Sequence, residues 1–309
     1  ADETQSKSLV SNNITALFSD NQGNKWIGTI AGISKYAPSV RHFGLLNEFW
    51  FANKRFNNNV YHVYEDKAGT IWLGTLSGGL VRLRNNRIDK IYPEVRDGKY
   101  VSKSVRCIYQ DSKGTYWIGT RDEGLFTLNP QTETFELVAN KQNGKLNNNV
   151  IRSIKEDAAG NLWIGTQLGL YRKTGSQFTF YRADNNINNN VIYHIEESPD
   201  RKHLILASFR GGLQLFNKTT ETFKTLRHIK GDSLSLSNNN VMSLAWVNDD
   251  TLLVGTYGGG LNIYSLKEQS FKHFTEKQGL ANAVYGIVYK GKGNCWLSTN
   301  SGLVKYNLY

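Results

Sequence analysis

A four-residue motif, Trp-Ile-Gly-Thr or Trp-Leu-Gly-Thr, recurs along the chain and begins at Trp26, Trp72, Trp117 and Trp163. Weaker copies of the same motif begin at Ile205, Leu253 and Trp296. The seven copies are separated by 46, 45, 46, 42, 48 and 43 residues. A repeat of about 45 residues that holds several short strands is typical of a β-propeller. The sequence therefore predicts an all-β chain that folds as one seven-bladed propeller over residues 1–309.

Each repeat reads as four antiparallel strands joined by tight turns. In the second repeat, strands are predicted over 60–65, 70–75, 80–83 and 88–92, because apolar and β-branched runs there are bounded by Asn, Asp and Gly turns. Helical periodicity is absent. The predicted blades are 11–46, 57–92, 102–138, 147–181, 188–226, 238–274 and 281–309.

An Asp-x-x-Gly turn precedes the motif in four repeats, at Asp20, Asp66, Asp111 and Asp157. Asp in such a turn accepts a hydrogen bond from the backbone two residues on, and Gly tolerates positive φ. A calcium-binding loop is the alternative interpretation, but such a loop needs more oxygen ligands at alternate positions than these segments supply. We therefore interpret these segments as hairpin turns, and the Trp of each motif as a core residue between neighbouring blades.

The last repeat contains three predicted strands, since 303–306 reads as the third and the sequence ends at Tyr309. Either residues 1–7 or a part of a longer parent protein is expected to supply the fourth. An open sheet edge of this kind can pair with another chain.

Composition limits the partners. The net charge of +11 favours an anionic partner such as an acidic sugar, a nucleic acid or a lipid surface. Lys and Arg are scattered without a block of five, which argues against nucleic acid. No apolar run of 18 residues is present, and the chain has no signal peptide and does not begin with Met, which indicates a mature or excised segment. Cys107 and Cys295 fall in repeats that are not neighbours, so we expect no disulfide.

Two sets of positions vary within the otherwise fixed repeat. The first set is the second residue of the first strand, and the second set is the residue that follows the second strand. Antiparallel pairing places both sets at the same end of a blade. Arginines at these positions fall in repeats three to five and aromatic residues mostly in repeats five to seven, and the link before repeat two adds Trp50. Guanidinium groups bind carboxylate or sulfate, and flat aromatic faces suit a sugar ring. The predicted ligand-binding residues are Trp50, Tyr61, Arg106, Arg121, Arg152, Tyr193, Phe209, Arg210, Tyr257 and Tyr285. Each of these side chains could instead simply pack between blades.

No catalytic constellation or metal site is predicted. The six histidines lack metal-ligand spacing, and no Ser or Cys lies in a nucleophile turn. His62 and His194 occupy the same position in repeats two and five, which is more typical of buried, hydrogen-bonded histidines than of a symmetric site. We expect no cofactor.

The fourth repeat, from Asn148 to Leu170, resembles the two-component regulator propeller repeat, whose pattern runs Asn-Asn-x-Val-x-x-Ile-x-x-Asp-x-x-Gly-x-x-Trp-Ile-Gly-Thr-x-x-Gly-Leu. The segment 230–239 is similar to the family's long link between blades. Repeats five and six depart from the pattern at the Trp, and repeat five also departs at the Asp-x-x-Gly turn.

The resemblance implies the periplasmic sensor region of a hybrid two-component histidine kinase of glycan-degrading gut bacteria. In that family two propellers precede an immunoglobulin-like domain, a membrane helix and a kinase. The implied ligand is an oligosaccharide, and the charge favours an acidic or sulfated one. The implied partners are the adjacent propeller and immunoglobulin-like domains and a second copy of the receptor, with no nucleic acid. By this interpretation the segment itself is not an enzyme.

Two alternatives remain open. The chain could be a protein-interaction or dimerisation propeller of the same receptor without a ligand of its own. It could also be a propeller lyase similar to the streptogramin lyases, which would require a cluster of His, Glu and metal at the mouth of the propeller.

Overall fold

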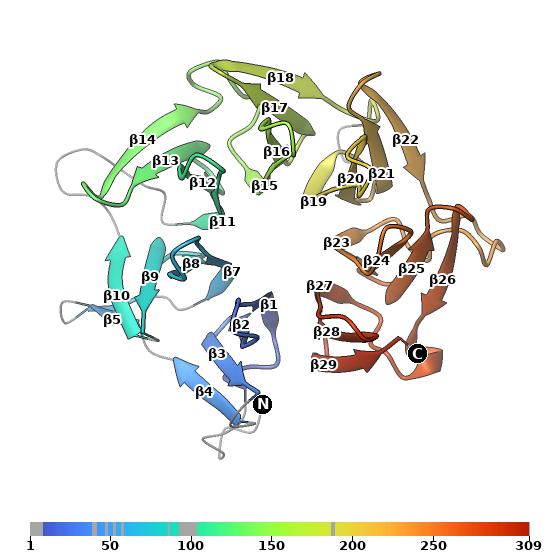
Figure 1. The fold of residues 1–309 in the computed structure, drawn as a ribbon, viewed down its shortest axis with the longest axis horizontal. Coiled ribbons are helices and arrows are strands. Elements are labelled where there is room, and N and C mark those ends of the chain that lie inside the picture. The colour runs from blue at the N-terminus through green and yellow to red at the C-terminus, as the bar shows by residue number, and fades with distance from the viewer. Residues whose placement is uncertain are drawn as a thin grey trace. The chain divides into compact units, whose positions relative to one another are not determined.

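A computed structural model describes residues 9–38, 42–46, 49–51, 54–56, 59–85, 87–92, 104–186 and 189–308 (Figure 1). Seven antiparallel sheets follow one another along the chain, six with four strands and the last with three among the described residues. Strand order within each sheet follows the sequence, so the chain has the predicted fold of a seven-bladed β-propeller. It divides into two compact units, Ala1–Ile151 and Arg152–Tyr309, and we describe each by itself.

The first unit contains blades one to three and a separate two-stranded hairpin. Its strands are β1 (Ile14–Ser19), β2 (Lys25–Thr29), β3 (Gly32–Ala37), β4 (His42–Leu46), β5 (Phe49–Phe51), β6 (Lys54–Phe56), β7 (Val60–Glu65), β8 (Ile71–Thr75), β9 (Leu80–Arg84), β10 (Arg87–Tyr92), β11 (Val105–Gln110), β12 (Tyr116–Thr120), β13 (Leu125–Asn129) and β14 (Thr134–Ala139). The four strands predicted for the second repeat are confirmed to within one residue at each end, whereas the β5–β6 hairpin was not predicted.

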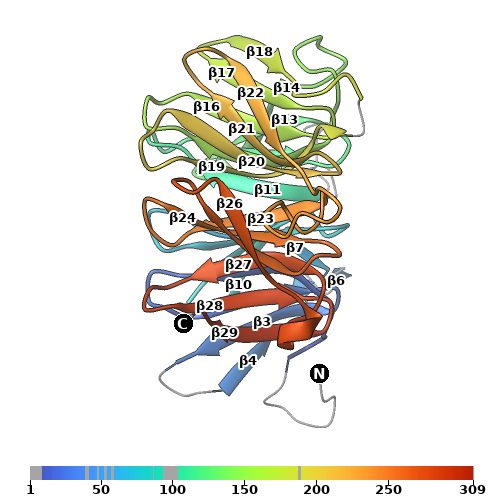
Figure 2. The same cartoon turned by 90° about the vertical axis from the view of Figure 1, so that its right-hand side faces the viewer.

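Among the described residues, the second unit contains blades four to seven and one short 3₁₀-helix. Its elements are β15 (Ile151–Glu156), β16 (Leu162–Thr166), β17 (Leu170–Thr174), β18 (Gln177–Tyr181), β19 (Val191–Glu197), β20 (His203–Phe209), β21 (Gly212–Asn217), β22 (Thr222–Leu226), β23 (Val241–Trp246), β24 (Thr251–Thr256), β25 (Leu261–Ser265), β26 (Ser270–Phe274), η3 (Glu276–Gln278), β27 (Val284–Tyr289), β28 (Asn294–Thr299) and β29 (Gly302–Asn307). Figure 2 shows these strands from the side. The predicted absence of a fourth strand in the last blade is confirmed for the described residues, and residues 1–7, the proposed source of that strand, lie outside them.

The core lies between successive sheets, and the motif Trp fills it. Trp26 packs with Val60 and Leu73 of the next blade, and Trp163 packs with Ile192 and Leu206 of the blade after its own. Both indole rings are 1% exposed. In blades five and six, Ile205 and Leu253 take the same place, in contact with apolar residues of the following blade, as predicted. Burial of these large apolar faces stabilises the pairs of sheets named here.

A hydrogen bond couples each Asp-x-x-Gly turn to the motif Trp six residues later. The indole Nε1 donates to the Asp Oδ2 at 2.8–2.9 Å in blades one to four. The other carboxylate oxygen accepts from backbone N–H groups of the turn, including Ala68, Lys113 and Ala159 two residues on. The predicted hairpin turn is therefore confirmed, and it also satisfies the one polar atom of a buried Trp.

The Gly and Thr of the motif have separate roles. A Cβ on Gly28 or Gly165 would lie 2.8–2.9 Å from Val60 or Ile192 of the next blade, so only Gly allows the sheets to approach this closely. The Thr hydroxyl donates to the carbonyl of the turn Gly that follows, at 2.8–3.0 Å in six blades. The Gly therefore sets sheet spacing and the Thr closes the turn between the second and third strands.

Both cysteines are free and buried, as the sequence predicted. Cys107 lies in β11 and Cys295 in β28. Burial raises the pKa of the Cys107 thiol to about 12 and that of Cys295 to about 11. Both therefore behave as small apolar side chains rather than as reactive thiols.

Candidate functional site

The variable residue of the first strand occupies a β-bulge. In six blades the pairing of the first strand with the second shifts register across this residue, which leaves it without a cross-strand partner. The bulge residues are Thr15, Tyr61, Arg106, Tyr193, Met242 and Tyr285. Because a bulge residue is unpaired and its side chain is re-aimed, its identity can vary while the sheet stays intact.

The second variable set lies beside the bulges, as predicted from antiparallel pairing. The backbone N–H of the residue after the second strand donates to the carbonyl of the residue just before the first strand of the same blade. Examples are Leu76 to Asn59 at 2.9 Å, Arg121 to Ser104 at 3.0 Å and Tyr257 to Asn240 at 2.8 Å. Within each of these blades the two sets therefore share one end of the sheet.

In the first unit, two predicted site residues from neighbouring blades contact each other. The Arg106 guanidinium lies over the Tyr61 ring at 4.1 Å from the ring centroid. The Nε atom of Arg106 is buried and has no hydrogen-bond partner among the described residues. Stacking fixes the plane of the guanidinium and leaves its edge for an anion. Arg121, in the same blade, is exposed at the same end of the sheet.

In the second unit, four predicted residues form an arginine–aromatic stack, Arg152, Tyr193, Phe209 and Arg210. The Arg152 guanidinium lies 4.4 Å from the Tyr193 centroid, the Tyr193 and Phe209 rings are 5.9 Å apart, and the Arg210 guanidinium lies 5.7 Å from the Phe209 centroid. The stack joins blades four and five, with a cation at each end of an aromatic pair.

Gln167 orients Arg152, a role that the sequence did not reveal. Its Oε1 accepts hydrogen bonds from Arg152 Nε at 3.0 Å and Nη2 at 2.6 Å. Gln167 is the residue after β16, so it belongs to the second variable set, and that membership was the available signal. Two hydrogen bonds and the Tyr193 ring together hold the guanidinium in one plane.

Tyr257 and Tyr285 form a second aromatic pair in the same unit. Their ring centroids are 6.1 Å apart, and Tyr257 is 49% exposed. Burial, followed by the charge of the neighbouring Tyr257, raises the pKa of the Tyr285 phenol, so the Tyr285 ring is neutral at physiological pH. Exposed neutral aromatic faces are suited to stacking on sugar rings.

Trp50 is the predicted site residue whose position relative to the others the structure does not describe. It lies in β5, which pairs with β6 and neighbours β10, the last strand of blade two. Its side chain lies outside the described part of the structure. Trp50 therefore stays a prediction from the sequence.

A charged network that the sequence did not predict links three blades of the second unit. Glu196 Oε1 lies 3.3 Å from His194 Nε2, and Glu196 Oε2 lies 2.9 Å from Lys155 Nζ. The Nδ1 atom of His194 accepts from the backbone N–H of Leu244 at 3.1 Å. Burial alone would raise the pKa of Glu196, but the hydrogen bond from His194 and the Lys155 charge outweigh it and lower the pKa to about 2. His194 is therefore a hydrogen-bonded histidine rather than a metal ligand.

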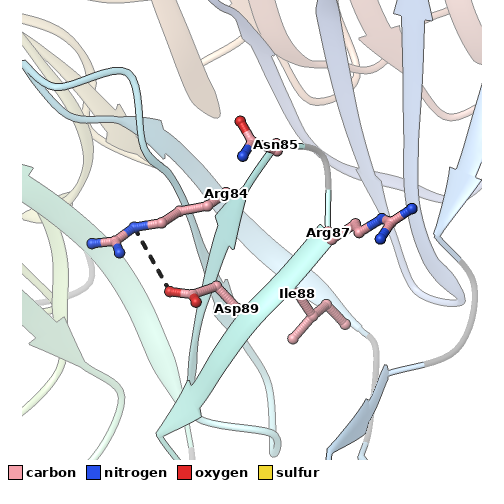
Figure 3. Close-up of a pocket in the computed structure, with 5 residues that line it drawn as sticks. All are labelled: Arg84, Asn85, Arg87, Ile88 and Asp89. Atoms are coloured by element: carbon pink, nitrogen blue, oxygen red, sulfur yellow. Dashed lines mark ion pairs between the residues drawn. The ribbon is translucent and has the colours of Figure 1, made fainter.

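An open hollow of about 550 Å³ lies on the outer hairpin of blade two, lined by Arg84, Asn85, Arg87, Ile88 and Asp89 (Figure 3). Asp89 lies 3.7 Å from Arg84 and 2.6 Å from Arg82, so its carboxylate offsets the charge of both arginines. The hollow is formed by β9 and β10, not by the bulge residues. We do not include it in the candidate site.

Among the residues that the structure describes, no group of three or more His, Cys, Asp and Glu side chains is arranged to hold a metal ion. No helix in the described ranges has the length and apolar character needed to span a membrane.

The sheets and the repeated Asp–Trp turns define the protein class as a β-propeller. Four segments match the family model of the two component regulator propeller, namely residues 8–31, 54–77, 99–122 and 145–167. These segments are the first four repeats of the motif, so the resemblance to this family that the sequence predicted is matched over those four repeats. A comparison with curated proteins found no match.

Solved structures with the same fold include several propellers. An extracellular domain from B. thetaiotaomicron, described as that of a hybrid two component system, is 20% identical over 97% of this chain with a TM-score of 0.80. PorZ, a surface component of the type-IX secretion system of Porphyromonas gingivalis, is 14% identical over 97% of the chain with a TM-score of 0.77. The chain spans 40% of the first structure and 47% of the second.

Virginiamycin B lyase from Staphylococcus aureus is 12% identical over 95% of this chain and 94% of its own length, with a TM-score of 0.70. At these identities the likeness shows the fold alone.

Proposed function

We propose that this chain is a ligand-sensing propeller from the extracytoplasmic, periplasmic region of a hybrid two-component histidine kinase. Its matched repeats and its similarity to extracellular domains described as parts of two-component systems support this proposal. Because the chain spans only about 40% of those structures, the kinase, an adjacent propeller and an immunoglobulin-like domain are proposed to lie elsewhere in a longer protein. The segment itself carries out no chemistry.

The proposed ligand is an acidic or sulfated oligosaccharide. The observation that carries this proposal is the arginine–aromatic stack, in which Arg152 is held in plane by Gln167 and lies over Tyr193. An oriented guanidinium binds a carboxylate or sulfate through two hydrogen bonds, and the neighbouring Phe209 ring offers a face to a sugar. The Arg106–Tyr61 pair of the first unit repeats the same combination. The net charge of +11 favours association with an anion.

Signalling would follow from differential binding. A ligand shifts a receptor between two arrangements only as far as it binds one arrangement more tightly than the other. The bulge residues Tyr61 and Arg106 of consecutive blades contact each other, so one ligand can bridge these two blades. Adjacent domains and a second receptor copy are the proposed recipients of that shift.

Isothermal titration of the 309-residue chain tests the proposal. We use tetragalacturonate and a chondroitin sulfate tetrasaccharide as acidic probes, with a cello-oligosaccharide of equal length as the neutral probe. Binding of an acidic probe, weakened at least tenfold by Arg152→Ala, is expected. The matched control is Arg172→Ala, because Arg172 also stacks on aromatic rings, Trp163 at 5.7 Å and Tyr181 at 5.5 Å, but lies in the third strand of its blade and pairs with Glu221. Binding of neutral glycans alone would refute the acidic ligand, and no binding by any probe would refute the oligosaccharide ligand.

A second candidate function, docking to a second copy of the chain, is favoured by one loop. Ile229 and Leu234 are 59% and 61% exposed, although Ser235 Oγ hydrogen-bonds to the backbone of Ile229 and fixes the loop. Rigid exposed apolar residues suit a protein interface. Sedimentation of the native chain and of Ile229→Ser/Leu234→Ser tests this function, which predicts self-association in the native chain only.

A further inference from the structure

Arg210 has a backbone conformation that its side chain disfavours. Its φ is +64°, in the left-handed region where a Cβ crowds the backbone. The turn Phe209-Arg210-Gly211-Gly212 of blade five corresponds to Tyr257-Gly258-Gly259-Gly260 of blade six. Gly258, the equivalent residue, has a φ of +103°. Glycine would therefore suit position 210, yet an arginine occupies it.

The surrounding turn holds this conformation without using the Arg210 side chain. The backbone N–H of Arg210 donates to Asn240 Oδ1 at 3.2 Å, and Arg227 Nη1 donates to the Arg210 carbonyl at 3.3 Å. Gly212 N–H donates to the Asn239 carbonyl at 2.9 Å. All of these contacts use backbone atoms of residues 210 and 212, so they would persist with glycine at position 210.

The Arg210 guanidinium is exposed beside the arginine–aromatic stack. It lies 5.7 Å from the Phe209 ring centroid, and no carboxylate in the described ranges lies within ion-pair distance of it. The acid of the adjacent loop, Asp184, is paired with Arg227 at 3.2 Å and accepts from Asn189 Nδ2 at 2.8 Å. Arg210 therefore presents an uncompensated cation at the end of the stack, opposite Arg152.

A positive φ is not by itself a sign of function, since Arg201 shares it, but at Arg210 it coincides with an exposed guanidinium beside the arginine–aromatic stack. We propose that Arg210 is the residue that selects an acidic group on the ligand, and that its left-handed backbone sacrifices stability for this selection. The inference rests on the proposed function, since it assigns a role within the same stack. A ligand that spans the Tyr193–Phe209 pair would place one acid near Arg152 and a second near Arg210, so the ligand class is an oligosaccharide with at least two acidic groups.

Replacing the arginine by glycine separates this role from a structural one. Arg210→Gly removes the guanidinium and the backbone strain together. We therefore expect an unchanged or higher midpoint of guanidinium chloride denaturation, combined with at least a tenfold rise in Kd for tetragalacturonate. Binding of methyl-esterified tetragalacturonate, which lacks the charges, should be the same in the native chain and the variant.

The chain supplies a matched control in the same blade. Arg201 is also exposed, also has a positive φ, at +59°, and lies in the turn between β19 and β20 at the other end of the sheet. Arg201→Gly removes the same charge and the same type of strain. We expect it to stabilise the fold to a similar degree and to leave the Kd for tetragalacturonate within twofold of the native value.

The possible outcomes are distinguishable. If the native chain binds tetragalacturonate and Arg210→Gly binds it equally well, the role of Arg210 is refuted while the proposed function stands. A denaturation midpoint that falls in Arg210→Gly would show that the arginine is retained for stability, which overturns the inference. If the native chain binds neither the acid nor the ester, the proposed function itself is wrong and the inference falls with it.

Discussion

Replacing Asp157 by alanine should destabilise the protein by about 3 kcal/mol. The Asp157 side chain is 1% exposed and accepts from Trp163 Nε1 at 2.8 Å, from Asn161 N at 2.9 Å and from Ala159 N at 3.0 Å. Its loss leaves the buried indole N–H without an acceptor, and an unpaired buried donor costs about 1–3 kcal/mol. The two turn N–H groups are half-buried and can partly reach water, so they add about 1 kcal/mol together.

The assay is guanidinium chloride denaturation followed by Trp fluorescence, with stability compared at a common slope. Trp163→Phe keeps the buried ring and removes its donor, and we expect it to cost about 1 kcal/mol. In a double-mutant cycle, Asp157→Ala and Trp163→Phe should couple by at least about 1 kcal/mol. The matched control is Asp200→Ala in the corresponding turn of blade five, where Asp200 is 52% exposed and bonds Ser198 and Lys202 rather than an indole. Additive costs at positions 157 and 163 would refute the coupling.

The pH dependence has a definite sign. Burial raises the pKa of Asp157, but hydrogen bonds from Trp163 and Asn161 outweigh it, so the folded-state pKa lies below the ordinary value of 3.8. The stabilisation by Asp157 is therefore complete above pH 3.8 and is lost as the pH falls through the folded-state pKa. The stability difference between the native chain and Asp157→Ala should shrink only below about pH 4. A difference that shrinks between pH 7 and pH 5 would contradict this assignment.

Three further changes test other features. Gly165→Ala should destabilise the protein by more than about 2 kcal/mol, because the added Cβ meets the next blade. Gly175→Ala, at a φ of +60° in open space, should cost only about 1 kcal/mol. Equal costs of the two variants in urea denaturation would disprove the role of Gly165 in sheet spacing. Cys107 and Cys295 should not react with a thiol reagent at pH 8 until the protein unfolds, because their pKa values are raised to about 12 and about 11; fast labelling of the native protein would contradict their burial. Glu196→Gln should lower the free energy of unfolding by about 1–2 kcal/mol at pH 7. Because the pKa of Glu196 is lowered from 4.5, this difference should vanish only as the pH falls through about 2. A difference that vanishes by pH 5 would argue against the Lys155 and His194 contacts.

The fold was predictable because each blade repeats the same local requirements. The strand limits of the second blade, the Asp turns and the Trp contacts between blades all follow from alternation, turn chemistry and spacing. The hydrogen bond between Asp66 and Trp72 was not predicted, although its six-residue spacing is visible in four repeats. Recognising it requires knowing that the turn and the following strand bring position i close to position i+6.

The candidate site was predictable only in part. Sequence variation located the bulge residues and the residues beside them, because the chain contains seven copies to compare. It could not show that Arg106 stacks on Tyr61 or that Gln167 holds Arg152, since these contacts depend on side-chain conformations and on packing between blades. The left-handed backbone of Arg210 was equally hidden, although glycine at the corresponding position of blade six pointed to it.

The bulges separate recognition from folding. Register in each blade is set by the paired residues on either side of the bulge, such as Val105 and Cys107 around Arg106. A substitution at the bulge changes the exposed chemistry and leaves the ladder unaltered. Point mutation can therefore diversify ligand preference one blade at a time within a constant scaffold, and a combinatorial library restricted to these six positions should yield mostly folded variants.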